Sequence, residues 1–254
     1  MPNIQPLTLE KHGSKRWLRN SSYAFAAKDV VAPLVLAEIP TAAAALPIGF
    51  MLHQGACVPV AVLGLVPGQN LFVDSTGRWL GQYIPAFYRA YPFYLVPGND
   101  GSQVLCIDES SGLVTDGPQG EPFFTPEQKP VKVIADVLAF LGRISASRKI
   151  TENVCGLLQK HHLIQPWSLK LQTGRSERAV EGLLRIDDAA LNALPAEPFL
   201  ELRNAGALPL VYGQLLAMQN LSMLPQLARA HAEAGPAATP RPMGDTLDFS
   251  GLTP

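Results

Sequence analysis

The sequence predicts an α+β protein, with a mainly antiparallel β N-terminal half and a mainly helical C-terminal half packed on it as one unit. Proline and glycine divide the first half into short apolar runs, whereas apolar residues recur at helical spacing after Pro130. No Gly/Ser-rich linker separates the halves, and 47% hydrophobic residues in 254 supply a core. We expect one domain over residues 1–234, β-rich over 1–125 and helix-rich over 126–234, followed by a flexible Pro/Gly-rich tail over 235–254.

The β-rich half reads as a short helix followed by a series of strands joined by tight turns. The helix is Ala-rich and spans Thr41–Leu46. The predicted strands are Ile48–His53, Val58–Val66, Asn70–Asp74, Arg78–Ile84, Phe93–Val96 and Gln103–Asp108. Asp74-Ser75-Thr76-Gly77 is a hairpin turn, and Asn and Gly residues over 98–101 suit a second one.

In the helix-rich half, a long helix is predicted from Pro130 onward. Its apolar residues include Ile134, Val137, Leu138, Leu141 and Ile144. A further helical stretch either starts at a Thr151 cap or continues the first helix.

Beyond this helix, the sequence predicts a hairpin, short capped helices and an uncharged final helix. Trp167–Gln172 and Ala179–Ile186 form the hairpin, and Asp187 caps a short helix. Leu208 to about Leu224 forms the final helix, whose apolar residues point all round the helical wheel. Because no charge lies between Arg203 and Arg229, we expect this helix to be buried in the fold or in a subunit contact.

Charge, cysteine content and hydropathy exclude several classes of protein. Lys and Arg number 20 against 21 Asp and Glu, so the basic surplus that nucleic-acid binding requires is absent. Cys57, Cys106 and Cys155 are widely spaced, which indicates buried free thiols rather than disulfides or a metal site. Prolines and glycines interrupt the uncharged stretch Ile39–Val73, so we expect no membrane span. The N-terminus has no apolar signal-peptide core, which predicts a cytoplasmic protein.

The sequence contains none of the strong catalytic motifs for dinucleotide, nucleoside triphosphate, hydrolase or zinc-protease chemistry. The densest cluster of functional side chains runs from Arg78 to Tyr94, with seven aromatic residues and two arginines in seventeen positions. Such a segment can bind a peptide, an indole-like ring or an anion, or it can pack into the core. The candidate binding residues are Trp79, Tyr83, Arg89, Tyr91, Phe93 and His53. For Arg89 and His53 we favour a structural role, and we predict neither a catalytic residue nor a metal or cofactor.

Several ordered blocks of the sequence resemble the bacterial SapC family. They include Glu38-Ile39-Pro40, Asn70-Leu71-Phe72-Val73, Tyr83-Ile84-Pro85-Ala86, Tyr91-Pro92-Phe93 and Leu105-Cys106-Ile107-Asp108. His12, Trp79 and Arg89 belong to the same pattern, which extends over about residues 7–230. The chain departs from the family at Gly49, where a β-branched residue is usual, and at Ala90, where a second basic residue is common.

The resemblance implies a bacterial accessory protein without a recognisable catalytic centre. The missing catalytic motifs and the uncharged final helix predict that it binds a protein or peptide partner. Association with a surface layer is implied only by the family name. The alternative is an enzyme or small-ligand carrier with an aromatic and arginine pocket. It would serve a system linked to flavin-dependent tryptophan-halogenase-like proteins or TonB-dependent receptors. A homo-oligomer through the uncharged helix Leu208–Leu224 is a further expectation.

Overall fold

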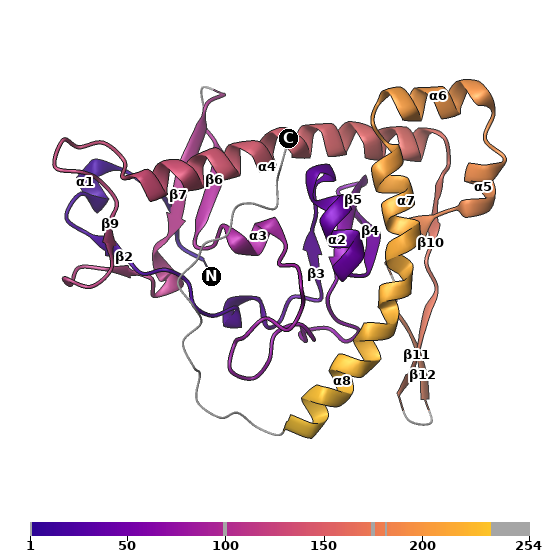
Figure 1. Cartoon of the computed structure of the whole chain (residues 1–254), viewed down its shortest axis with the longest axis horizontal. Coiled ribbons are helices and arrows are strands. Elements are labelled where there is room, and N and C mark those ends of the chain that lie inside the picture. The colour runs from indigo at the N-terminus through magenta and orange to yellow at the C-terminus, as the bar shows by residue number, and fades with distance from the viewer. Residues whose placement is uncertain (1, 99–100, 174–175, 181, 235–254) are drawn as a thin grey trace. The chain divides into compact units, whose positions relative to one another are not determined.

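The computed structural model describes residues 2–98, 101–173, 176–180 and 182–234, and their helices and strands are labelled in Figure 1. The chain divides into two compact units. Unit 1 contains residues 2–21 and 88–146, and unit 2 contains residues 22–87 and 147–234. Each unit therefore takes residues from both halves of the sequence. The predicted tail over 235–254 lies outside the described residues.

Unit 1 contains two small antiparallel sheets, with strand orders β1-β7-β6 and β8-β2-β9. Its elements are β1 (Ile4–Pro6), α1 (Leu9–His12), β2 (Arg16–Trp17), β6 (Phe93–Pro97), β7 (Gln103–Asp108), the 3₁₀ helix η3 (Glu109–Ser111), β8 (Val114–Thr115) and β9 (Glu121–Pro122). The predicted pair of strands around residues 98–101 is confirmed as β6 and β7. The core of this unit includes Trp17, Phe93, Ile107, Phe123 and Phe140.

Unit 2 is built on a five-stranded antiparallel sheet of order β10-β13-β4-β5-β3. Its elements before residue 88 are η1 (Ala24–Ala26), β3 (Val31–Pro33), η2 (Leu36–Glu38), α2 (Ile39–Ala45), β4 (Ile48–His53) and β5 (Ala56–Val62). Those after residue 160 are β10 (Ile164–Pro166), β11 (Leu169–Thr173), β12 (Ser176–Val180), β13 (Leu184–Ile186), α5 (Asp188–Asn192), α6 (Ala196–Asn204), α7 (Leu208–Ala217), η4 (Met218–Ser222) and α8 (Met223–Ala234). Helix α3 (Ala86–Arg89) crosses the boundary between the two sets of residues.

The long helix α4 is a single element, Lys132–Lys160, so the second helical stretch continues the first. It begins two residues after Pro130, and its residues from Ser147 onward belong to unit 2. Thr151 therefore caps no helix. Its Oγ1 donates to the Ser147 carbonyl at 2.7 Å and accepts from the Leu36 N–H at 2.8 Å.

Two of the predicted strands, Asn70–Asp74 and Arg78–Ile84, are wrong. These segments share one isolated bridge, between Val73 and Trp79, around the predicted turn. The Trp79 indole N–H donates to the Tyr83 carbonyl at 3.0 Å, four residues further on. Because an extended strand cannot bring these two groups together, the chain bends after the bridge instead of continuing as a strand.

The prediction of one strand over Ala179–Ile186 is also wrong, because β12 ends at Val180 and β13 begins at Leu184. Strand β12 pairs with β11, as expected of a hairpin. Strand β13 instead pairs with β10 and β4 and so joins the main sheet of unit 2. In that sheet Gly49 gives room to Trp167, since a Cβ on the glycine would lie 3.2 Å from the indole ring.

The predicted final helix is divided into α7, η4 and α8. A continuous α-helix would need an N–H at Pro225 to bond with the Leu221 carbonyl, and proline has none. The Asn220 side chain in η4 also donates to the Ala43 and Leu46 carbonyls, at 2.8 and 3.0 Å. The helix changes geometry at the place where these two constraints meet.

Helix α7 is not buried on all sides by the fold itself, so of the two alternatives expected for this helix the subunit contact stays a prediction. Gly213 faces α2, where a Cβ would come within 2.4 Å of Ile39 Cγ2, and the two helices lie side by side in Figure 1. Leu210, Val211, Gln214 and Ala217 are buried. Tyr212 and Leu216, however, are 47% and 66% exposed. One side of this uncharged helix therefore faces solvent.

Candidate functional site

The six residues predicted to bind a partner or ligand are distributed over both units. Trp79, Tyr83 and His53 belong to unit 2, and Arg89, Tyr91 and Phe93 belong to unit 1. Trp79 and Tyr83 are each 7% exposed and are brought together by the indole hydrogen bond. The Trp79 ring stacks on Phe72 with centroids 5.4 Å apart and meets the edge of Tyr23 at 5.8 Å. These contacts are those of a packed aromatic core.

Tyr83 is hydrogen-bonded to Glu38, a buried carboxylate that was not among the six candidate residues. Glu38 lies at the end of η2 and is 1% exposed. Its Oε1 accepts from the Tyr83 hydroxyl at 2.9 Å and from the Ala86 N–H at 2.7 Å. Its Oε2 accepts from the Val35 N–H at 3.0 Å. An ionised carboxylate only accepts hydrogen bonds, so these three donors favour the charged form.

The Glu38 side chain joins segments that are far apart in the sequence. It ties the start of η2 to the Tyr83-Ile84-Pro85-Ala86 segment before α3. The Glu38-Ile39-Pro40 block was visible in the sequence as part of the family pattern, but nothing local indicates that its acid is buried. The long-range contact with Tyr83 is what makes burial favourable, because it supplies a donor.

In unit 1, Phe93 is 3% exposed and packs edge-on against Trp17, with ring centroids 5.2 Å apart. The Arg89 guanidinium carbon lies 5.1 Å from the centroid of the Phe140 ring. Burial, followed by the charge of Asp108, raises the pKa of the Tyr91 hydroxyl. Tyr91 is therefore neutral at physiological pH.

Substituting Arg89 with lysine is expected to lower the free energy of unfolding by about 1–3 kcal/mol, the range for removing partners from buried polar groups. Lysine keeps the charge but loses the planar guanidinium that stacks on the Phe140 ring. Thermal and urea unfolding of the full chain measure this effect. Arg203→Lys, at an exposed arginine, is the control. An Arg89→Lys melting curve that coincides with that of the parent would contradict the structural role of this residue.

His53 lies at the end of β4, where the chain turns into β5, and it is exposed. The turn uses positive φ angles at Gln54 and Gly55. Gln159 of α4 holds the turn, since its Oε1 accepts from the Cys57 N–H at 3.2 Å and its Nε2 donates to the Gly55 carbonyl at 3.3 Å. His53 thus lies in a different element from the aromatic segment, Arg78–Tyr94.

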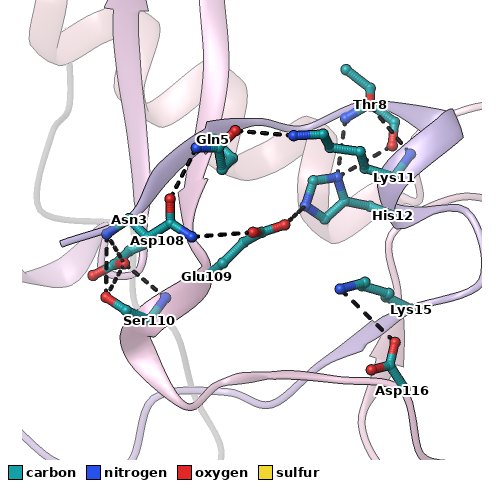
Figure 2. Close-up of polar contacts among 10 residues, drawn as sticks. All are labelled: Asn3, Gln5, Thr8, Lys11, His12, Lys15, Asp108, Glu109, Ser110 and Asp116. Atoms are coloured by element: carbon teal, nitrogen blue, oxygen red, sulfur yellow. Dashed lines mark hydrogen bonds and ion pairs between the residues drawn. The ribbon is translucent and has the colours of Figure 1, made fainter.

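A second buried titratable group, His12, lies in unit 1 and is fully buried. Figure 2 shows it at one end of a chain of polar contacts. Lys11 Nζ donates to Gln5 Oε1 at 3.0 Å, and Gln5 Nε2 donates to Asn3 Oδ1 at 2.9 Å. Asn3 Nδ2 then reaches Glu109 Oε2 at 3.4 Å, and His12 Nε2 lies 3.3 Å from Glu109 Oε1. Glu109 is the group that both Asn3 and His12 contact.

The surroundings of His12 suit a neutral imidazole. Nδ1 lies 3.3 Å from both the N–H and the carbonyl oxygen of Thr8. In the neutral ring, Nδ1 accepts from the Thr8 N–H, while the protonated Nε2 lies 3.3 Å from the Glu109 carboxylate. Burial lowers the pKa of His12 below its ordinary value, although the Thr8 hydrogen bond and the Glu109 charge oppose this. The edge of the ring also meets buried Phe123, with centroids 5.6 Å apart.

Asp108 strengthens the same attachment by capping η3. Its Oδ1 accepts from the Ser110 N–H at 2.9 Å and from the Asn3 N–H at 2.9 Å. The backbone N–H of Glu109 donates to the Asn3 carbonyl at 3.0 Å. Asp108 thus caps η3 and at the same time holds the backbone of Asn3 (Figure 2).

All three cysteines are free and buried, as predicted. Burial raises the pKa of the Cys106 thiol. The Cys155 thiol is hydrogen-bonded to Cys57, and this contact together with burial raises its pKa far above the usual range. Such thiols are poor nucleophiles at neutral pH because the reactive thiolate is scarcely populated.

Glu38 and His12 both connect segments that are far apart in the sequence. Both are buried, and Nε2 of His12 is directed at Glu109. Across the described ranges, no three His, Cys, Asp or Glu side chains are arranged to hold a metal ion. None of the helices that the structure describes combines the length and the apolar character needed to cross a membrane.

Comparison with known proteins gives one family and no individual relative. No curated protein and no solved structure was found to match the chain. The model of the SapC family matches residues 7–224, which include His12, Glu38, Glu109 and the aromatic segment. The chain therefore belongs to the SapC family.

Proposed function

We propose that this protein is a non-catalytic binding protein that recognises another protein through the solvent-facing side of α7. Pro209, Tyr212 and Leu216 are exposed and follow one another at helical spacing. Leu216, at 66% exposed, carries the proposal, because its neighbours in the helix anchor α7 firmly to α2 and the sheet. A rigid helix that presents a large apolar side chain is a common way of binding a protein partner.

The charge pattern indicates the chemistry of the partner. No Asp, Glu, Lys or Arg occurs between Arg203 and Arg229, so the contact face offers no ion pair. A charged partner surface would lose water without gaining an opposite charge. The matching partner is therefore a protein whose own contact face is apolar and uncharged.

The packing of the aromatic segment supports this function over a ligand pocket. Trp79, Tyr83 and Phe93 are at most 7% exposed and make edge-on, stacked or hydrogen-bonded contacts within their own units. Their surfaces are used in packing. The alternative, an enzyme or small-ligand carrier that binds at these residues, predicts instead that tryptophan or indole raises the melting temperature of the protein.

The test compares Leu216→Glu with Leu52→Glu, because Leu52 is a second exposed leucine of unit 2, 56% exposed on β4. Each protein is used as bait in native bacterial lysate, and retained chains are quantified by mass spectrometry. We expect a stoichiometric partner with the parent and with Leu52→Glu, and at least about tenfold less with Leu216→Glu, since burying one leucine contributes about 1.5–3 kcal/mol.

Three outcomes would contradict the proposal. The first is equal retention of the partner by both variants, and the second is the absence of a stoichiometric partner with the parent. The third is self-association of the purified parent that Leu216→Glu abolishes, with no other protein bound. That result would assign the α7 face to a homo-oligomer.

A further inference from the structure

The N-terminal segment over residues 2–12 is attached to unit 1 by very little apolar burial. Among these described residues only His12 is buried, and Ile4 and Leu9 are each 38% exposed. Strand β1 has three residues and lies at the edge of its sheet, and α1 is a single turn. A segment with so few buried contacts opens locally at a lower free-energy cost than the core does.

The remaining attachment is polar: part of it is backbone pairing along β7, and part of it consists of side-chain contacts with Glu109. The backbone of β1 pairs with β7, and the Leu7 N–H donates to the Leu105 carbonyl at 2.8 Å. Beyond the strand, Asn3 and His12 both contact Glu109 (Figure 2). The His12 ring is therefore the buried anchor of the segment.

We propose that His12 is an acid-sensitive latch, and that taking up a proton at its imidazole releases residues 2–12 from strand β7. The proton comes from solvent and adds to Nδ1. The nitrogen then no longer accepts from the Thr8 N–H and must donate to the Thr8 carbonyl, which lies at the same distance of 3.3 Å.

The charges around His12 determine the direction of the response. Glu109, from η3, attracts the protonated ring, whereas Lys15, which precedes β2, repels it. Asp116 offsets part of the Lys15 charge from 3.9 Å, and the buried neighbour Phe123 carries no charge. Loss of water outweighs the attraction of Glu109, so the attached segment holds the neutral ring and its pKa is lowered.

The sign of the pH dependence follows from linkage. In the detached segment His12 titrates near its ordinary pKa of about 6.5. In the attached segment the pKa is lower, so the detached form binds more protons as pH falls below about 6.5. Attachment is therefore complete above that pH and weakens on acidification, until the pH passes the pKa of the attached state.

Hydrogen exchange of the full chain between pH 8 and 5.5, corrected for the intrinsic exchange rate, tests this latch. We expect protection of the Leu7 amide and its neighbours to fall below pH 6.5, approaching tenfold per pH unit, while protection of the β4–β5 amides stays constant. A pH-independent profile over residues 2–12 would overturn the proposal. A parallel loss in β4 and β5 would also overturn it, because that result indicates global acid unfolding.

Two variants and one control identify the titrating group. His12→Gln keeps a donor for Glu109 and cannot be protonated, so its protection should not change with pH; His53→Gln should behave like the parent. If His12→Gln detaches the segment at every pH, the Glu109→Gln variant tests whether His12 is the titrating group. Removing that negative charge lowers the pKa of His12 further, so the acid-induced loss should grow. A parental pH response in His12→Gln, or a smaller one in Glu109→Gln, would overturn the latch.

Discussion

Replacing Glu38 with alanine is expected to lower the free energy of unfolding by about 3–5 kcal/mol, since hydrogen bonds to a charged group contribute about 1.5–3 kcal/mol each and are not additive. The substitution leaves the Tyr83 hydroxyl and the N–H groups of Val35 and Ala86 without their acceptor. All three contacts are buried, so water cannot readily replace the carboxylate.

Urea unfolding followed by circular dichroism at pH 7 measures this loss, and two variants calibrate it. Tyr83→Phe removes one donor and should cost about 1–2 kcal/mol. Glu197→Ala, at an exposed glutamate of α6, should change stability by less than about 0.5 kcal/mol. If Glu38→Ala and Glu197→Ala unfolded at the same urea concentration, the role given to the buried carboxylate would be wrong.

The second large effect is expected at Gln214, the polar residue inside the uncharged helix α7. Gln214 is fully buried, its Nε2 donates to the Ile48 carbonyl at 3.1 Å, and its Oε1 accepts from the Ile186 N–H at 3.0 Å. It therefore joins the helix to β4 and β13 at once. Gln214→Leu removes both partners, and we expect a loss of about 2–4 kcal/mol, since each buried group left unpaired costs about 1–3 kcal/mol.

The matched control is Gln219→Leu, because Gln219 is exposed in η4 and should tolerate leucine with a change below about 0.5 kcal/mol. Urea midpoints of the two variants and the parent, measured side by side, give the comparison. Leucine has nearly the volume of glutamine, so steric strain contributes little. A loss below about 1 kcal/mol for Gln214→Leu would show that the two backbone groups find other partners.

Local patterns in the sequence predicted many elements correctly. The strand Ile48–His53 has the predicted bounds, the Ala-rich helix is present as α2, and the turn over residues 98–101 lies between the predicted strands. Asp187 caps α5 by accepting from the Ala190 N–H at 3.0 Å. These features depend on residues close together in the chain, so spacing and turn chemistry suffice to predict them.

The wrong predictions arise where a hydrogen bond overrides the pattern of apolar residues. In one case the bond is local, and in the other it joins distant segments. Arg78–Ile84 alternates like a strand, but the Trp79 indole bonds forward to Tyr83 and bends the chain. The predicted final helix changes geometry where Asn220 bonds to carbonyls around α2 and Pro225 cannot continue the ladder. The periodicity of side chains along the sequence carries no information about these bonds.

At the candidate site, too, local sequence predicted some features and distant contacts determined others. The sequence indicated that Arg78–Tyr94 is unusual, and it indicated both a core role and a binding role for its aromatic side chains. In the structure Trp79, Tyr83 and Phe93 are buried, which the sequence did not distinguish from exposure. Neither Glu38 nor His12 was a candidate, because a lone acid and a lone histidine have no local signature of burial.

By itself, the sequence determined the α+β class, the buried free cysteines and the resemblance that the family match confirms. Composition, periodicity and short ordered blocks are properties of the chain that do not depend on which segments meet. Only the tertiary structure decided that Glu38 collects three donors, that Gln214 joins two strands, and that Leu216 faces solvent. The physical reason is that burying a polar group is favourable only when a partner reaches it, and here each partner comes from a separate segment of the chain.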